Sequence, residues 1–378
     1  MQNSFSTHDF LSNESTNPDF NGPMISDASV QEALKNYTAL CNIEKISCFK
    51  SHSANTNKVF LIFPEEEKES FVLRVSGEQK HGMINSNERL NHIQIETQLL
   101  KFLNNSGFPF VPQVLLNDSG GLVSSEKYVA FSYMPGKQIG SFNNLSNFNT
   151  LRRADFFRRI GEVSKVLSQY SFVQTSSEKT LTELNNETLE RLNNIINLFK
   201  ESPSLLGNKL ISPYIGQLRE FGASLNLNPK LLSLTNPQMC HFDLHLGNAL
   251  FDQDKFTALL DWDWCRLGEW YGVDWVSAIA MCCYTYDPNG GELDGVYDAL
   301  QIADALSYLR QGFGETGRLP LNNERELLID TFRSYVFAQF LFTCDHYLED
   351  SSDHSKFIDM RHFLYLIIKN DFNQLIFT

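Results

Sequence analysis

Short apolar runs separated by polar turns dominate the first third of the chain. Runs rich in β-branched and aromatic residues lie at 46–50, 58–63, 71–75 and 128–133. A longer segment, 87–103, repeats apolar residues at helical spacing. Apolar runs bounded by polar turns are typical of strands, and a period of about 3.6 is typical of helices. We therefore predict a small antiparallel sheet with a helix in the N-terminal part of the chain.

Helical spacing dominates the rest of the chain. Helical patterns occur at 156–170, 183–200, 299–312, 324–348 and 356–371. Residues 1–28 are rich in Ser, Asn and Asp with few apolar positions, a composition typical of a disordered tail. The predicted class is α+β, with this tail, an N-terminal sheet-containing lobe at 29–134 and a larger, mostly helical C-terminal lobe at 135–378.

The most informative stretch lies between these helical patterns. Residues 240–248 are Cys-His-Phe-Asp-Leu-His-Leu-Gly-Asn, and residues 259–263 are Leu-Leu-Asp-Trp-Asp. Two short apolar runs flank a polar turn between the motifs, which predicts a hairpin. A hairpin of this length returns Asp261 to the side of Asn248. Their carboxylate and amide oxygens can then share a Mg²⁺ ion.

These residue types at this spacing suit phosphoryl transfer from ATP. One carboxylate orients the attacking hydroxyl, and an amide and a second carboxylate bind the metal on the phosphates. We assign the first role to Asp243 and the metal roles to Asn248 and Asp261. His241 is expected to brace the loop, and Asp263 is a candidate for a further metal or substrate contact.

A transition-metal site is the alternative interpretation of the same loop. His241, Asp243 and His245 have the ligand types that zinc or iron accepts. That alternative leaves Asn248 and the Asp-Trp-Asp motif unexplained, and no further His-rich segment lies nearby.

The two motifs together resemble those of the aminoglycoside phosphotransferase and choline kinase superfamily, the small-molecule relatives of protein kinases. The Cys-His-x-Asp…Gly-Asn-x-Leu and Leu-Asp-Trp-Asp patterns are most similar to the choline/ethanolamine kinase branch. Gly272-Val273-Asp274 resembles a downstream Gly-Phe-Asp of that branch. The resemblance implies a protein-kinase-like two-lobe fold, in which Asp274 supports the catalytic loop. It also implies ATP and Mg²⁺ as cofactors and a small molecule with a hydroxyl group as substrate.

Arg74 is the candidate phosphate ligand of the N-terminal lobe. It lies in the middle of an apolar strand pattern, where burying an unpaired charge is costly. A kinase-type site gives it a role, because such a residue contacts the phosphates and pairs with an acid on the next helix. Glu96 is our candidate partner, with Glu88 as a competitor. A solvent-facing arginine on an edge strand is the alternative.

Two further segments are candidates for nucleotide binding. Residues 51–57 occupy the position of a phosphate-binding loop, and Ser53 and Asn57 are its candidate ligands. The segment has no glycine, although glycine lets a backbone approach phosphates closely. Ser132 and Met134, just before Pro135-Gly136, resemble the hinge that binds adenine. A plain strand-to-turn junction explains that segment nearly as well.

The four tryptophans all lie within residues 262–275. Aromatic faces bind protonated and quaternary amines through cation–π contacts. The candidate substrate contacts are Asp263, Glu269, Trp270 and Tyr271, which would suit a cationic amino alcohol such as choline or ethanolamine. Alternatively, the rings pack the core below the catalytic loop. An aminoglycoside, homoserine or a sugar is an alternative acceptor. A different alternative is that the protein is a nucleotide-binding pseudokinase or scaffold without turnover.

The composition of the chain indicates which binding partners and which cellular location to expect. The chain has 378 residues and a net charge of −14, which argues against nucleic acid as a partner. It lacks an apolar run of about eighteen residues, so we expect no membrane span. Seven cysteines without a Cys-x-x-Cys pair favour reduced thiols and a cytoplasmic location.

Overall fold

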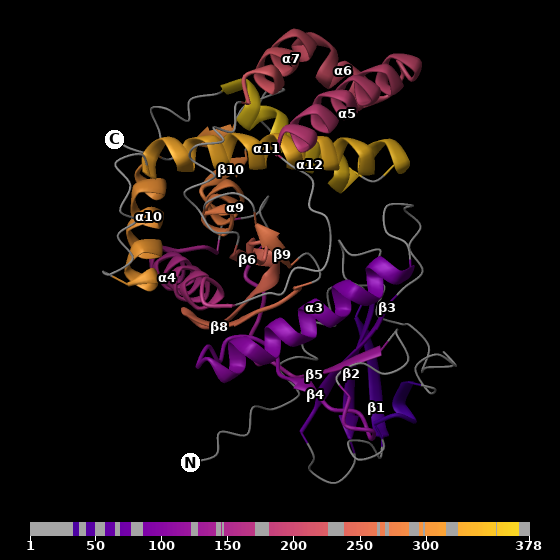
Figure 1. Cartoon of the computed structure of the whole chain (residues 1–378), viewed down its shortest axis with the longest axis vertical. Helices are drawn as coiled ribbons and strands as arrows, with labels where there is room; N and C mark the ends of the chain where they lie inside the picture. Colours follow the sequence, from indigo (N-terminus) through magenta and orange to yellow (C-terminus); the bar gives the residue numbers. More distant parts are fainter. Residues whose placement is uncertain are drawn as a thin grey trace. The chain divides into compact units, whose positions relative to one another are not determined.

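The structure of the protein, a computed structural model, divides into two compact units (Figure 1). Unit 1 comprises Met1–Thr97 and Pro112–Tyr133, and unit 2 comprises Gln98–Val111 and Met134–Thr378. The structure describes residues 33–37, 43–49, 57–64, 69–76, 86–121, 128–140, 145, 147–170, 181–225, 238–262, 265–268, 272–286, 295–297, 299–314, 324–352 and 354–369. The expected tail at 1–28 lies outside these residues. The predicted lobe boundaries stay predictions.

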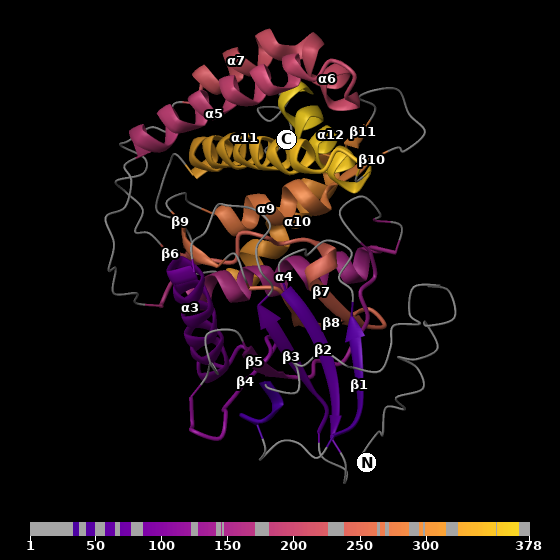
Figure 2. The same cartoon turned by 90° about the vertical axis from the view of Figure 1, so that its right-hand side faces the viewer.

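Five antiparallel strands form one sheet in unit 1, in the order β1-β2-β3-β5-β4 (Figure 2). The strands are β1 (Ile43–Phe49), β2 (Asn57–Pro64), β3 (Phe71–Ser76), β4 (Val114–Leu115) and β5 (Tyr128–Ser132). Helix α3 (Ser86–Asn105) follows β3 and continues into unit 2. The sheet and this helix are the elements that the apolar runs of the sequence predicted.

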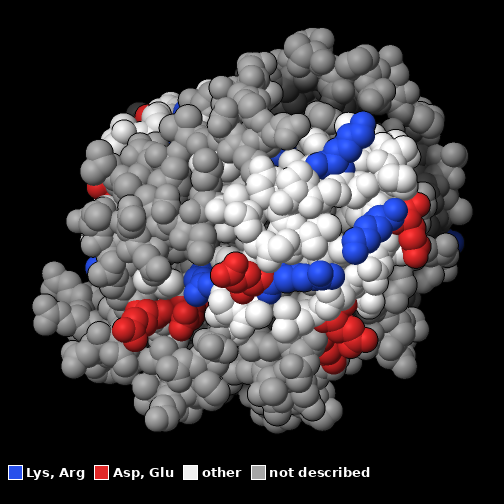
Figure 3. Space-filling model, turned by 90° about the horizontal axis from the view of Figure 1, so that it is seen from above, with Lys and Arg blue, Asp and Glu red and all other residues white. Residues whose placement is uncertain are grey.

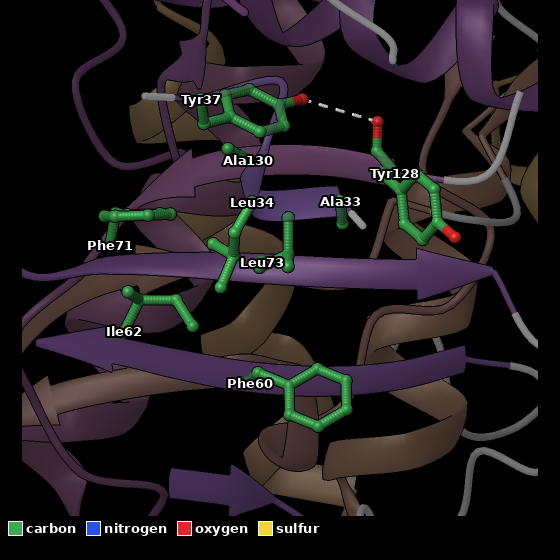
Figure 4. Packing of buried hydrophobic residues seen from close by; sticks show 9 residues of the cluster. All are labelled: Ala33, Leu34, Tyr37, Phe60, Ile62, Phe71, Leu73, Tyr128 and Ala130. Carbon is green, nitrogen blue, oxygen red and sulfur yellow. Dashed lines mark hydrogen bonds between the residues drawn. The ribbon is translucent and has the colours of Figure 1, made fainter. Parts of the chain in front are cut away.

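One face of the sheet packs on the short helical turn at Ala33 and Leu34 (Figure 4). Alternate residues of a strand point to the same side. The buried side chains of this cluster therefore recur at every second position of the three central strands: Phe60, Ile62, Phe71, Leu73, Tyr128 and Ala130. The hydroxyl of Tyr37 donates to the carbonyl of Tyr128 at 3.4 Å, which ties the helical turn to β5.

Unit 2 is mostly helical (Figure 1). Its helices are α4 (Thr150–Leu167), α5 (Leu181–Glu201), α6 (Leu206–Ile211), α7 (Ile215–Ala223), α9 (Val273–Cys282), α10 (Ala299–Phe313), α11 (Glu324–Glu349) and α12 (His354–Lys369). Its strands form antiparallel pairs: β6 (Gln238–Cys240) with β9 (Arg266–Gly268), β7 (Ala249–Asp252) with β8 (Lys255–Leu259), and β10 (Tyr284–Tyr286) with β11 (Gly295–Tyr297). The long helical patterns of the sequence correspond to α4, α5, α10, α11 and α12.

Helix α9 lies at the centre of unit 2, between α11 and α4 in both views (Figures 1 and 2). All ten of its residues are buried. A helix that is buried on every side needs apolar residues on every side. Its sequence therefore lacks a solvent-exposed polar face, and the pattern of apolar positions did not predict it.

The hairpin of β7 and β8 rests on a cluster of phenylalanines in unit 2. The ring of Phe256 packs edge-on against Phe110 and Phe251, with centroid distances of 5.8 and 5.7 Å. The N–H of Phe256 donates to Asp155 of α4 at 2.8 Å, and the N–H of Leu259 donates to the carbonyl of Phe110 at 2.7 Å. These contacts fix the hairpin on the helical body from both strand ends.

On the face shown in Figure 3, the described Lys and Arg side chains lie beside Asp and Glu side chains among uncharged residues. No helix among the described residues is long and apolar enough to cross a membrane.

Helices α4 and α10 cross with their backbones in contact. A Cβ atom on Gly161 of α4 would lie 2.1 Å from the carbonyl oxygen of Leu309. A Cβ atom on Gly312 of α10 would lie 1.8 Å from the carbonyl oxygen of Arg158. Both obstacles are backbone atoms, which cannot rotate away. The crossing therefore requires glycine at both positions.

Gly312→Ala should lower the free energy of unfolding by about 1–3 kcal/mol or more, because the added methyl group forces the two helices apart. Gly216→Ala is the matched control, since a Cβ atom on this glycine of α7 meets nothing within 4 Å. The control should be neutral or slightly stabilising. Urea unfolding of the three proteins measures the difference. A Gly312→Ala protein as stable as the control would contradict the close crossing.

Candidate active site

The loop after β6 is attached to α9 through one buried carboxylate. The backbone N–H groups of His241 and Phe242 both donate to Asp274, with N–O distances of 3.0 Å. Phe242 has a φ of 69°, in the left-handed region, where successive N–H groups can turn toward one anion. Residues other than glycine adopt this conformation rarely. Asp274 therefore stabilises a backbone shape that the loop alone would not favour.

Helix α9 also contacts the next part of the loop, through Ser277. Asp274 and Ser277 are three residues apart and lie on the same face of the helix. The hydroxyl of Ser277 accepts from the N–H of Leu244 at 3.3 Å, and the N–H of Asp243 donates to Nδ1 of His241 at 3.3 Å. The backbone N–H groups of residues 241–244 thus each have a side-chain acceptor. These acceptors replace the regular backbone pairing that an irregular loop lacks.

The electrostatics of Asp274 follow from its burial. Its side chain is 1% exposed, and burial raises its pKa to about 6, against the opposing effect of the two N–H donors. The carboxylate lies in the first turn of α9, where the helix dipole favours negative charge. Gly272 precedes the helix with a φ of 66°, and a Cβ atom there would lie 2.9 Å from Leu328. The left-handed, crowded position of Gly272 and the place of Asp274 in the first helical turn explain why glycine and aspartate occur in the Gly-Val-Asp sequence.

His241 links the loop to the end of the hairpin. Its Nδ1 accepts from the N–H of Asp243, so its Nε2 is the donor to the carbonyl of Leu260, at 2.9 Å. Burial lowers the pKa of His241 to about 4, which keeps the ring neutral at physiological pH. The ring packs against Trp262 with a centroid distance of 4.5 Å. His241 therefore connects the loop to the hairpin end, and its supporting role in the site stays a prediction.

The hairpin brings Asn248 and Asp261 to the same end of β7 and β8. The N–H of Leu260 donates to the carbonyl of Asn248 at 2.7 Å, which fixes the residue directly before Asp261. The Asn248 amide nitrogen donates to Asp243, to its carbonyl at 2.9 Å and to its carboxylate at 3.0 Å. Asp261 is exposed and has a φ of 60°, a second left-handed residue in the site. The structure thus places Asn248 beside Asp243 and Asp261 at the same end of the hairpin, and their catalytic and metal roles stay predictions.

Asp243 is ionised and reachable. Its side chain is 31% exposed, and its carboxylate lies 3.5 Å from Nε2 of His245. Burial alone would raise the pKa of Asp243, but the charge and hydrogen bond of His245 outweigh it and lower that pKa to about 2. Burial likewise favours neutral His245, yet its pKa is raised because Asp243, Asp261 and Asp359 oppose that effect. An ionised carboxylate can accept a hydrogen bond from a hydroxyl group.

Gly247 and Gln138 make contacts that fix the end of the loop that precedes β7. A Cβ atom on Gly247 would lie 2.6 Å from the ring of His245, whose Nδ1 accepts the Gly247 N–H at 3.0 Å. The side-chain amide of Gln138 donates to the carbonyl of Gly247. The segment that contains Gln138 is also attached to the hairpin, because the hydroxyl of Thr257 in β8 donates to the carbonyl of Pro135 at 2.7 Å. No motif of the sequence marks Gln138, so its contact with the loop was not predicted.

The geometry does not favour the transition-metal alternative. Both ring nitrogens of His241 are occupied within the protein. Within the part of the chain that the structure describes, no group of three or more His, Cys, Asp or Glu residues is placed to bind a metal ion. Amide and carboxylate oxygens remain, and these are ligands that Mg²⁺ accepts.

In unit 1, Arg74 pairs with Glu96 through two hydrogen bonds. Arg74 Nη1 donates to Glu96 Oε1 at 2.9 Å, and Nη2 donates to Oε2. The two side chains are 11% and 4% exposed, and the guanidinium lies 5.2 Å from the ring centre of Phe131. A two-point pair of this kind fixes the direction of the guanidinium. The structure therefore places Glu96 opposite Arg74, and the phosphate role stays a prediction.

The remaining predicted contacts are only partly described. The N–H of Ser132 donates to the carbonyl of Gln113 at 2.8 Å, so this amide belongs to the sheet. Asn57 begins β2, and its side chain lies outside the described residues. Ser53, Asp263, Glu269, Trp270 and Tyr271 also lie outside them. The tryptophans Trp262 and Trp275 are both buried, at 1% and 4% exposure, and pack in the core.

Solved structures that are similar to this chain include small-molecule kinases. A spectinomycin phosphotransferase, solved with ADP and spectinomycin, is 13% identical with a TM-score of 0.58, and the match covers 94% of this chain and 99% of that one. An ethanolamine kinase from Plasmodium vivax is 11% identical with a TM-score of 0.58, covering 91% of this chain and 88% of that one. A choline kinase from Cryptosporidium parvum is 15% identical with a TM-score of 0.55, covering 93% and 98%. At these identities the likeness shows the fold.

The sequence itself identifies the family. A comparison with curated proteins found no match. The phosphotransferase enzyme family matches residues 52–306, a span that includes the paired Arg74 and Glu96, the loop after β6 and helix α9. The protein therefore belongs to the phosphotransferase enzyme family.

Proposed function

We propose that the protein transfers the γ-phosphoryl group of ATP to a hydroxyl group of a small molecule. The observation that supports this most directly is the placement of Asp243. Its carboxylate is ionised, partly exposed and fixed by Asn248, with Asp261 at the end of the same hairpin. Asp243 would accept the hydrogen bond of the substrate hydroxyl and orient its oxygen for attack.

A Mg²⁺ ion fits the donor atoms of this site. The amide nitrogen of Asn248 is occupied by Asp243, which leaves the amide oxygen as the metal ligand. Asp261 would contribute its carboxylate. When bound, the ion would neutralise charge on the nucleotide phosphates. In unit 1, Arg74 would contact the phosphates while Glu96 fixes its orientation.

A positively charged substrate suits the local field. Asp243, Asp261 and Asp359 all act on the pKa of His245, so three carboxylates lie within electrostatic reach of this loop. A protonated or quaternary amine near the hydroxyl would be attracted to such a site. We therefore propose an amino alcohol, such as choline or ethanolamine, as the first candidate acceptor. An aminoglycoside is the second, and homoserine and simple sugars follow.

ADP release from ATP and Mg²⁺ should appear with one class of acceptor in a panel of choline, ethanolamine, spectinomycin, homoserine and simple sugars. Asp243→Asn keeps the size of the side chain but removes its charge. It should lower kcat by about 10²- to 10⁴-fold while nucleotide affinity stays close to normal. Unchanged turnover in this variant would contradict the role of Asp243. Nucleotide binding without turnover on any acceptor would favour a pseudokinase.

Asp261→Asn should weaken Mg²⁺-dependent nucleotide binding by more than about tenfold, because one anionic metal ligand is lost. Asparagine is the suitable replacement, since it tolerates the left-handed backbone at this position. Asp252→Asn is the matched control, an exposed carboxylate at the other end of the same hairpin. Titration of nucleotide with and without Mg²⁺ measures the effect. Equal affinities in both variants would exclude Asp261 from the metal site.

A further inference from the structure

A buried pair of hydroxyl groups connects the catalytic loop to helix α11. The hydroxyl oxygens of Ser277 and Tyr335 lie 2.8 Å apart. Ser277 is 0% exposed and Tyr335 is 2% exposed. The same Ser277 oxygen accepts from the N–H of Leu244, the residue directly after Asp243. The contacts therefore run from the loop through α9 to α11. Figures 1 and 2 show α9 between α11 and β6, the strand that precedes the loop.

Packing alone does not account for the hydroxyl of Tyr335. A phenylalanine would fill nearly the same volume, whereas a buried hydroxyl costs free energy unless it has a partner. Burial also raises the pKa of Tyr335, so the phenol is neutral. A neutral phenol can donate to Ser277 and leave the second lone pair of the serine oxygen for the N–H of Leu244. The tyrosine then fixes the direction in which Ser277 accepts.

Ser277 and Asp274 bind the catalytic loop on opposite sides of Asp243. Asp274 binds the backbone before Asp243, and Ser277 binds the backbone after it. The backbone of Asp243 is thus fixed on both sides by one face of α9. A displacement of one reacting group by about 1 Å can cost a hundredfold in rate. The second attachment therefore controls where the carboxylate of Asp243 lies.

We propose that Ser277 and Tyr335 are positioning residues for Asp243, through which α11 sets the conformation of the catalytic loop. The proposal rests on the proposed function only for its kinetic consequence. The hydrogen-bond path itself is independent of the substrate.

Tyr335→Phe should lower kcat by roughly tenfold and leave the KM values for ATP and the acceptor within about twofold. Tyr347→Phe is the matched control, because Tyr347 is also a buried tyrosine of α11. Its hydroxyl accepts from the N–H of Gly207, at 3.2 Å, and not from the catalytic loop. The control should lose a similar amount of thermal stability but keep kcat within about twofold. Equal kcat values for the two variants would overturn the proposal.

Ser277→Ala and the double variant with Tyr335→Phe complete the test. If both residues act through the N–H of Leu244, the double variant should lose no more kcat than the worse single variant. Multiplicative losses would show two independent effects and would overturn the shared path.

Amide exchange separates this proposal from the proposed function, because it needs no activity. The peptide that covers residues 241–246 should exchange faster in Tyr335→Phe than in Tyr347→Phe. Equal exchange in both variants would overturn the proposal even if the wild-type protein is an active kinase. Faster exchange in Tyr335→Phe, with no turnover by the wild type on any acceptor, would retain the positioning path and reject the kinase reaction.

Discussion

The buried carboxylate of Asp274 is the interaction on which the candidate active site depends. A loop without regular secondary structure must find partners for its backbone N–H groups, and two of them meet on this one side chain. The left-handed conformation of Phe242 is compatible with that arrangement and costly without it. Because α9 is packed on all sides, the carboxylate is fixed in turn by the core of unit 2.

The metal side of the site follows from the same attachment. His241 receives the N–H of Asp243 on one ring nitrogen and donates to Leu260 from the other. Leu260 in turn pairs with Asn248, so the loop, the hairpin end and the residue before Asp261 form one connected hydrogen-bond network. Burial keeps His241 neutral, which this pattern of one donor and one acceptor requires. His241 and Leu260, which would contact neither metal nor substrate, thus help to position the oxygens that would.

The sequence was most informative where chemistry depends on spacing. The distance between Asn248 and Asp261 predicted a hairpin that joins them, and the isolated charge of Arg74 predicted an acidic partner on the next helix. Helix α9 was not predicted, because uniform burial removes the polar face from which a helix is recognised. Ser277 and Gln138 were missed for a related reason. Their importance comes from a single contact with the loop backbone, and such a contact leaves no pattern along the chain.

The most direct test of this account is the turnover of Asp274→Asn with a productive acceptor. Asparagine keeps the shape of the side chain but can turn only one acceptor oxygen toward the two N–H groups. We expect kcat to fall by more than about tenfold while the protein stays folded and binds nucleotide normally, because only the loop loses its attachment. A variant with wild-type kcat would show that the loop keeps its shape without the carboxylate, which would contradict the account.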